Sequence, residues 1–173
     1  MRWRAVVVLA ALVACSRGAA TSIPSPTARF SLTSPSFGEG RAIPSRFTCD
    51  GQNESPPLAW SGSPSGDWSV LVVSDPDAPG GVFVHWVMAV PPGTSSLPAG
   101  RAPAGAIQGR NSFGHRRYDG PCPPRGDQAH RYVFRMFALE GNGAPDLSGF
   151  PNDPGDVGSR AEAEGTLTGT YGR

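Results

Sequence analysis

Two apolar runs joined by a short polar loop dominate the middle of the chain. Residues 70–73 and 82–90 have the length and the Val, Phe and Trp content of buried strands, and the segment SDPDAPGG connects them. Alternation divides the second run between two faces, with Phe83, His85, Val87 and Ala89 on one and Val84, Trp86, Met88 and Val90 on the other. Because both faces are largely apolar, we predict a central strand that is covered on both sides.

The loop and the second run also carry polar residues that a plain core does not need. Asp75 and Asp77 lie on either side of Pro76, and His85 lies within the second run. Pro76 and Pro79 fix the loop backbone, so a carboxylate on this loop is held in one place. Taken alone, these residues favour a simpler interpretation, in which Asp75 caps a turn and His85 is a core histidine with its hydrogen bonds satisfied.

A second polar cluster, YDGPCPPRGDQAHRYVF at residues 118–134, favours a binding site over that simpler interpretation. Its first half is rich in Pro and Gly and predicts a stiff loop. Its second half alternates, with His130, Tyr132, Phe134 and Met136 on one face and Arg131, Val133, Arg135 and Phe137 on the other. His130 and Tyr132 are therefore roughly 6 to 7 Å apart on one face of a strand. An imidazole and a phenol presented together suit the binding of a small polar group, and with Asp75 and His85 they indicate one composite pocket.

The rest of the chain favours an all-β fold. Its 173 residues include 23 Gly and 19 Pro, long helical patterns are missing, and short strand-like runs recur between turn signals. Residues 29–173 have the length of one domain and contain no internal repeat or second linker. We therefore predict a single all-β domain, as a β-sandwich.

Several motifs occur together in a fixed order. DPDAP is followed by a strand containing HW, then by N-x-x-G, Y-x-G-P-C-P-P-x-G and H-R-Y-x-F, with IPSRFTCDGQNESPPLAW before them and GTYGR at the end. This set resembles the phosphatidylethanolamine-binding protein family, in its bacterial Raf-kinase-inhibitor-like branch, over residues 30–173. The resemblance implies a β-sandwich with short peripheral helices and a small cavity for an anionic head group, such as phosphate, phosphoethanolamine or a phosphorylated side chain.

The resemblance also implies which residues bind the ligand: Asp75, Asp77, His85, Tyr118, Gly120, Pro121, Pro123, Pro124, His130 and Tyr132. In chemical terms the two histidines can donate to phosphoryl oxygens, and Tyr132 and the loop N–H groups add neutral donors. Asp75 would orient a histidine and favour its charged form, which offsets a carboxylate near an anion. Asp77 is expected to brace the loop.

The cysteines fit an exported protein. Apart from Cys15, only Cys49 and Cys122 are present, an even pair that an oxidising compartment would allow to bond. Both lie in family blocks next to the expected pocket loops, so we predict a disulfide between them. The alternative is two buried free thiols.

The first 28 residues predict export and anchoring. Residues 1–14 have basic residues followed by an apolar run that is too short to span a bilayer, as in a signal peptide. Leu-Val-Ala-Cys resembles a bacterial lipobox, so cleavage would leave Cys15 as a lipidated N-terminus, followed by a flexible tether to residue 28. The alternative is an ordinary signal peptide with a coincidental cysteine. We predict an extracytoplasmic lipoprotein that is anchored to the cell membrane.

Charge excludes some partner classes. The formal net charge is +1, which indicates neither nucleic acid nor a strongly acidic partner. A local basic excess consists of Arg110, Arg116, Arg117, Arg125, Arg131 and Arg135 against only Asp119 and Asp127. These arginines either line the pocket mouth and bind phosphate, or form a solvated surface.

The same polar residues admit an enzymatic alternative. Asp, His and Tyr can perform acid–base chemistry, and His85 with His130 and a carboxylate could bind a divalent metal ion. No convincing nucleophile accompanies them, because GSPSG at residues 62–66 has Pro64 where G-x-S-x-G needs serine, and HExxH, P-loop and dinucleotide motifs are missing. We therefore predict a binding protein without a metal or cofactor, whose partners are a phosphate-containing small molecule or phospholipid head group. A protease- or kinase-inhibitor-like action on an extracytoplasmic protein is a further expectation, and a metal-dependent or acid–base hydrolase is the alternative.

Two features depart from the family pattern. Val90 replaces an asparagine that often follows the HW strand in relatives, and the region after Leu139 is shorter and richer in Gly and Pro. In that region only residues 156–164 could form a helix, and residues 166–171 predict the closing strand. A shortened C-terminal region would leave the pocket more open.

Overall fold

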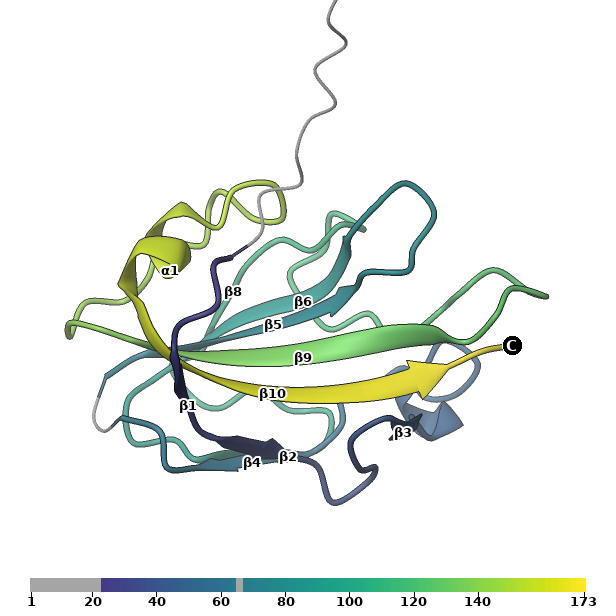
Figure 1. Ribbon diagram of the computed structural model, residues 1–173, viewed down its shortest axis with the longest axis horizontal. Coiled ribbons are helices and arrows are strands. Elements are labelled where there is room, and N and C mark those ends of the chain that lie inside the picture. The colour runs from purple at the N-terminus through teal and green to yellow at the C-terminus, as the bar shows by residue number, and fades with distance from the viewer. Residues whose placement is uncertain (1–22, 65–66) are drawn as a thin grey trace, which may run out of the picture.

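The computed structural model describes residues 23–64 and 67–173, and a seven-stranded sheet forms its centre (Figure 1). Six strands follow the order β1-β10-β9-β5-β6-β8, and β3 also pairs with β10. Their bounds are β1 Ala28–Arg29, β3 Arg41–Ala42, β5 Ser69–Asp75, β6 Phe83–Val90, β8 Ile107–Gln108, β9 His130–Leu139 and β10 Ala161–Tyr171. The contacts among β10, β9, β5 and β6 are antiparallel, so neighbouring strand ends meet at a common edge.

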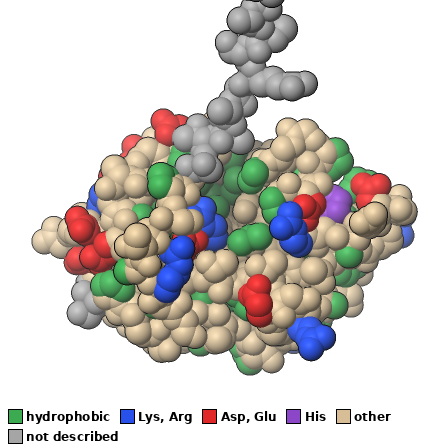
Figure 2. All heavy atoms as spheres, viewed as in Figure 1, with side chains coloured by type: hydrophobic (Ala, Val, Ile, Leu, Met, Phe, Trp, Pro, Cys, Tyr) green, Lys and Arg blue, Asp and Glu red, His purple; other side chains and the backbone are tan. Residues whose placement is uncertain are grey.

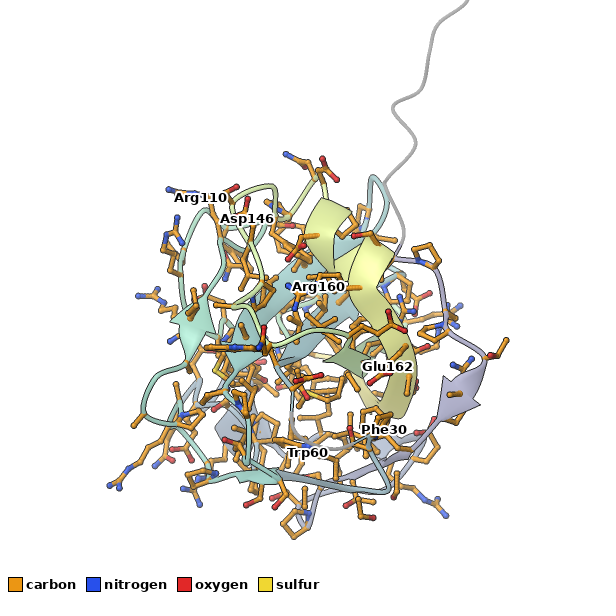
Figure 3. The ribbon with its side chains drawn as sticks, turned by 90° about the vertical axis from the view of Figure 1, so that its left-hand side faces the viewer. Phe30, Trp60, Arg110, Asp146, Arg160 and Glu162 are labelled. Atoms are coloured by element: carbon orange, nitrogen blue, oxygen red, sulfur yellow. A yellow bond between two sulfur atoms is a disulfide. The ribbon has the colours of Figure 1, made fainter. Side chains whose placement is uncertain are left out.

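A smaller sheet forms the second layer of the sandwich. It has the order β2-β4-β7, with bounds Ser31–Thr33, Leu58–Ser61 and Ser96–Leu97. The described residues also include two short helical segments, η1 at Ser45–Phe47 and α1 at Gly155–Arg160. Figure 3 shows the layers from the side, with Trp60 of β4 at the bottom and Arg160 of α1 above the large sheet. The predicted all-β sandwich with short peripheral helices is confirmed.

Apolar residues fill both faces of the large sheet. One cluster lies between the sheets and includes Leu71, Met88 and Phe134 together with Leu58 and Trp60 of the small sheet. A second cluster covers the opposite face and includes Val70, Val72, Val87, Phe137, Leu147, Phe150 and Val157. The expectation that the central strand is covered on both sides is therefore confirmed.

The side chains of β6 do not alternate as predicted near its start. Val73 of β5 pairs with Trp86 and Ser74 pairs with Val84, so His85 is an extra residue in a β-bulge. As a result Val84 packs in the same cluster as Val87, while Trp86 belongs to the other cluster. The predicted faces hold from residue 86 to 90 and are wrong at Val84 and His85, because a bulge turns two successive side chains toward the same side.

The C-terminal region has less helix and more strand than expected. The helix α1 ends at Arg160, whereas the pattern allowed one to residue 164. β10 begins at Ala161, five residues before the predicted closing strand, and pairs with β9 along its length. The gain of ladder hydrogen bonds to β9 outweighs the weak helical pattern of residues 161–164.

The N-terminal part of the described chain lies against the large sheet. Ile23 is buried in the second cluster, and the Arg135 guanidinium donates hydrogen bonds to the Ile23 carbonyl (3.1 Å) and the Ser25 hydroxyl (2.9 Å). The buried carboxylate of Glu164 binds both Arg135 and Arg29. Residues 23–28, which the sequence assigns to the tether, thus contact the domain. The predicted signal peptide, Cys15 and the first part of the tether lie outside the described residues.

No helix within residues 23–64 and 67–173 has the length and apolar character needed to cross a membrane.

A disulfide joins two loops at one end of the sandwich. Cys49, just after η1, is bonded to Cys122, and their Cα atoms are 5.4 Å apart. The predicted pairing is therefore present. It attaches the Pro-rich loop after Tyr118 to the segment that follows η1.

Removing this disulfide should lower the free energy of unfolding by about 4 kcal/mol, because it closes a loop of 73 residues in the unfolded chain. Urea unfolding of the wild type and of the Cys49→Ser/Cys122→Ser variant measures the difference. Equal unfolding midpoints would show that the bond contributes little.

Candidate functional site

His130 is held by a carboxylate at the end of the large sheet where β5 ends and β9 begins. Its Nδ1 lies 2.8 Å from Oδ2 of Asp75, the last residue of β5, because β5 and β9 pair in antiparallel register. Both side chains are buried. The Asp75 carboxylate also accepts the N–H of Asp77 at 2.8 Å, which fixes the start of the loop. Since Nδ1 donates to Asp75, Nε2 is the nitrogen left to face a ligand, and it lies 3.8 Å from Oδ2 of Asp127.

His85 is held by a backbone carbonyl. Its Nδ1 lies 2.8 Å from the Asp119 oxygen, and a carbonyl can only accept, so Nδ1 carries the proton. Burial lowers the pKa of His85, while the Asp119 carbonyl and the Asp75 carboxylate oppose this shift. The Gly120 backbone also lies close to this ring and, like the Asp119 carbonyl, raises its pKa. The imidazole is therefore neutral at pH 7 until a nearby anion favours its charged form.

Tyr132 brings a buried hydroxyl to the same place. Its side chain is fully buried, and its ring packs edge-on against that of His85 with the centroids 5.2 Å apart. The hydroxyl has no hydrogen-bond partner among the residues that the structure describes. Burial raises the pKa of Tyr132, and the Asp75 carboxylate raises it further. The hydroxyl thus stays protonated. The Asp75 carboxylate lies near enough to affect it, but among the described residues no group forms a hydrogen bond of good geometry with it.

The Gly120 loop is fixed by close backbone contacts. The Gly120 N–H donates to Oδ1 of Asn53 at 2.7 Å, and the Pro121 carbonyl accepts the Cys49 N–H at 3.1 Å. A Cβ on residue 120 would lie 2.4 Å from the Phe47 carbonyl oxygen, so only glycine fits. Further along, Pro123 is buried and its carbonyl accepts Nε of Arg173 at 2.7 Å, and Pro124 is exposed. The loop is therefore stiff, as the sequence predicts.

Tyr118 supports this loop from the core. Its side chain is buried, and its ring packs edge-on against Trp86 with the centroids 5.5 Å apart. Its hydroxyl donates to the Phe47 carbonyl at 2.8 Å. This hydroxyl is engaged within the protein, in contrast to that of Tyr132.

Asp77, in the loop after β5, binds Arg131 near the start of β9. Its carboxylate accepts the Arg131 backbone N–H at 2.9 Å and two guanidinium N–H groups at 2.9 and 2.6 Å. These hydrogen bonds lower the pKa of Asp77 to about 2. A cavity of about 470 Å³ lies beside this pair, lined by Asp77, Asp127, Gln128, Ala129, His130 and Arg131. The expected bracing role of Asp77 agrees with these contacts.

Asn111 and Asp119 support the site through hydrogen bonds, and the sequence alone predicted no role for either. The buried Asn111 amide donates to the His85 carbonyl (3.1 Å) and to the Asp119 carboxylate (2.8 Å). Burial alone would raise the pKa of Asp119, but hydrogen bonds from Asn111, His115 and Arg117 lower it. Asn111 is the first residue of the N-x-x-G motif, so this motif could have indicated its role. Asp119 occupies a variable position of Y-x-G-P.

The basic excess between residues 110 and 135 is largely paired. Arg117, Arg125, Arg131 and Arg135 form ion pairs with Asp119, Asp50, Asp77 and Glu164, respectively. Arg110 donates to the Gly114 carbonyl and Arg116 to the Gln108 carbonyl of β8, and Arg110 extends at the periphery of the molecule (Figure 3). Basic and acidic side chains lie interspersed on the face seen in Figure 2. Of these arginines, Arg131 lines the cavity beside His130, where Asp77 binds its guanidinium, and the others are not part of that lining.

The structure thus brings Asp75, His85, His130 and Tyr132 together. The Gly120 loop adjoins them through Asp119, and Asp77 lines the same cavity as His130. Among residues 23–64 and 67–173, no three His, Cys, Asp or Glu side chains are grouped so that they could hold a metal ion. The arrangement offers one phenolic donor and two imidazole nitrogens, a set suited to hydrogen bonding with a small anion.

Replacing Asp77 with Asn should destabilise the protein in a pH-dependent way. The pKa of Asp77 falls from 3.8 to about 2 on folding, so the pair stabilises fully above pH 4 and its contribution is lost as the pH falls toward 2. We expect a loss of up to about 1 kcal/mol at pH 7, since the pair is partly exposed. Thermal unfolding from pH 2 to 7 measures it, with Arg131→Gln as the matched variant. A loss that is as large at pH 2 would contradict this explanation.

Comparison with known proteins agrees with this geometry. Residues 33–172 match the family model described as phosphatidylethanolamine-binding protein. A UPF0098 protein of Methanothermobacter thermautotrophicus is 47% identical over 116 residues, covering 63% of this chain and 76% of the relative. LppC of Mycobacterium tuberculosis, which is named as a lipoprotein, is 45% identical over 119 residues, or 67% of this chain and 59% of LppC.

A solved structure also matches most of the chain. E. coli YbcL, described as a new member of the mammalian family of these proteins, superposes with a TM-score of 0.74 at 33% identity, covering 83% of this chain and 98% of YbcL. The fold, the family model and these relatives together show that the chain belongs to the phosphatidylethanolamine-binding protein family.

Proposed function

We propose that this protein binds phosphate or a phosphate-bearing head group, including that of a phospholipid, between His85, His130, Tyr132 and the Gly120 loop. The observation that carries this proposal is the buried Tyr132 hydroxyl, which has no acceptor among the described residues. A buried polar group without a partner costs about 1–3 kcal/mol. A ligand oxygen that accepts this hydrogen bond would recover that cost.

The two histidines complete a set of donors for such an oxygen. Asp75 fixes Nδ1 of His130 and the Asp119 carbonyl fixes Nδ1 of His85, so each ring has Nε2 left for a ligand. The Asp75 carboxylate is itself engaged by Nδ1 of His130 and by the Asp77 N–H. The cavity of about 470 Å³ adjoins this set at His130, and its lining does not include His85, Tyr132 or the Gly120 loop.

A thermal-shift titration with inorganic phosphate and phosphoethanolamine tests this proposal. A ligand at 100 times its dissociation constant should stabilise the protein by about 2.7 kcal/mol. His85→Ala and His130→Ala should abolish the stabilisation. No stabilisation by either ligand would reject the anion pocket.

Two tyrosine variants sharpen this test. Tyr132→Phe removes a hydroxyl without a partner, so it should preserve or raise the stability of the free protein and weaken phosphate binding on the order of tenfold. Tyr118→Phe removes a hydroxyl bonded to Phe47, so it should lower stability by about 1 kcal/mol and weaken binding less. The reverse pattern would place the ligand at Tyr118, as the family resemblance implies for that residue.

We also propose that the protein is exported and anchored to the cell membrane through a lipid on Cys15. The Leu-Val-Ala-Cys motif supports this, as does the similarity to LppC, which is named as a lipoprotein. Membrane attachment would place the anion pocket near a surface rich in phosphate groups. An inhibitor-like action on an extracytoplasmic protein, and the hydrolytic alternative, stay predictions.

Replacing Cys15 with Ser should release the protein from the membrane, because lipid attachment requires the thiol. Fractionation of cells that produce the wild type or the Cys15→Ser variant measures this. A Cys15→Ser protein that remains with the membranes would contradict lipid anchoring.

A further inference from the structure

The disulfide between Cys49 and Cys122 lies at the surface of the protein. Cys122 is an exposed residue, and Cys49, just after η1, is partly buried. An exposed disulfide can be attacked by an external thiolate, whereas a buried one resists reduction as long as the protein stays folded. A thiol can therefore reach this bond in the folded protein, from the side of Cys122.

A guanidinium lies beside the less exposed of the two sulfur atoms. Nη1 of Arg173 donates a hydrogen bond to Sγ of Cys49 at 3.3 Å. The Arg173 side chain is only 23% exposed, and its Nε donates to the Pro123 carbonyl at 2.7 Å, so its position is fixed. A fixed positive charge next to a sulfur atom stabilises the thiolate form. Cys49 is therefore the better leaving group when the bond is attacked.

A neighbouring carboxylate does not cancel this positive charge. Asp50 accepts hydrogen bonds from the Tyr171 hydroxyl at 2.7 Å and from Nη1 of Arg173 at 3.2 Å, and Arg125 lies 3.5 Å from it. The Tyr171 hydrogen bond, together with the two arginines, lowers the pKa of Asp50, so this group is an anion at pH 7. Two guanidinium groups thus face one carboxylate, and the surroundings of Cys49 stay net positive.

Noncovalent contacts also join the Gly120 loop to the segment after η1. The Gly120 N–H donates to Oδ1 of Asn53 at 2.7 Å, and the Cys49 N–H donates to the Pro121 carbonyl at 3.1 Å. Opening the S–S bond would remove one link among several. The loop would then be less restrained while its partners stay in place, so the bond can form again.

We infer that this disulfide is a site of reversible thiol–disulfide exchange with a dithiol reductant, and that the exchange begins at Cys122. A thiolate of the reductant attacks Sγ of Cys122, the S–S bond breaks, and Cys49 leaves as a thiolate beside Arg173. The second thiol of the reductant then displaces Cys122. Two electrons and two protons pass from the reductant to the protein, which leaves two protein thiols and an oxidised reductant.

A dithiol suits this bond better than a single thiol. The bond closes a loop of 73 residues and stabilises the fold, so the fold equally favours the bond. Cys49 therefore readily reverses a mixed disulfide with a single thiol, whereas the second thiol of a dithiol resolves it. The partner class is an oxidoreductase with two neighbouring cysteines. The inference is independent of the anion pocket, because the reaction takes place at the sulfur atoms.

Peptide mass mapping tests the direction of attack. The folded protein is treated with glutathione, and free thiols are then trapped with iodoacetamide. We expect glutathione on Cys122 with the alkyl group on Cys49 on the order of tenfold more often than the reverse. Glutathione mainly on Cys49, or reaction only after unfolding in urea, would overturn the inference.

The rate of reduction by dithiothreitol in the folded protein tests the role of Arg173. Arg173→Gln removes the charge and should slow reduction about threefold, while Arg173→Lys keeps the charge and should stay within about twofold of the wild type. Arg116→Gln is the matched control, because Arg116 is also exposed but donates to the Gln108 carbonyl, and its rate should equal that of the wild type.

A purely structural role for Arg173 predicts the opposite sign. Losing its hydrogen bond to Pro123 would loosen the loop and expose the S–S bond, so reduction would become faster. An unchanged or faster reduction of Arg173→Gln would therefore contradict the assignment of Cys49 as the leaving group.

Discussion

The hydrogen bond between the Asp75 carboxylate and Nδ1 of His130 is the interaction on which the site depends. Both side chains are buried where β5 ends and β9 begins. Removing either one would leave the other buried without its partner, which would lower the stability of the folded protein. The same carboxylate fixes the loop that follows β5 through Asp77, whose own carboxylate returns to Arg131 on β9. The antiparallel register of two core strands therefore sets the position of the side chains in the proposed site.

His85 shows how the fold places a second imidazole beside the first. In a regular strand its side chain would alternate with Trp86, but the bulge turns both toward the side of Tyr132. The hydrogen bond to the Asp119 carbonyl then fixes the tautomer. The result is a region with fixed donors and the Tyr132 hydroxyl, which has no hydrogen-bond partner among the described residues. Such an arrangement is typical of preorganised binding sites, where stability is given up locally for recognition.

The sequence was sufficient where local regularity decides the structure. The alternation of residues 130–136 was correct because β9 pairs with β10 in unbroken register over these residues, and with β5 from Val133 onward. It failed at Val84 and His85, since a bulge depends on how the partner strand aligns and no local pattern encodes it. The roles of Asn111 and Asp119 were missed for a similar reason, because their hydrogen bonds join segments whose proximity only the folded chain reveals.

A crystal structure of the protein with bound phosphate tests the central claim most directly. We predict phosphate oxygens within about 2.6–3.2 Å of the Tyr132 hydroxyl and of Nε2 on His85 and His130, with both Nδ1 hydrogen bonds unchanged. A phosphate that binds elsewhere, while the Tyr132 hydroxyl bonds to Asp75 or to a buried water, would contradict the account. In that case the hydroxyl would serve the core and not a ligand.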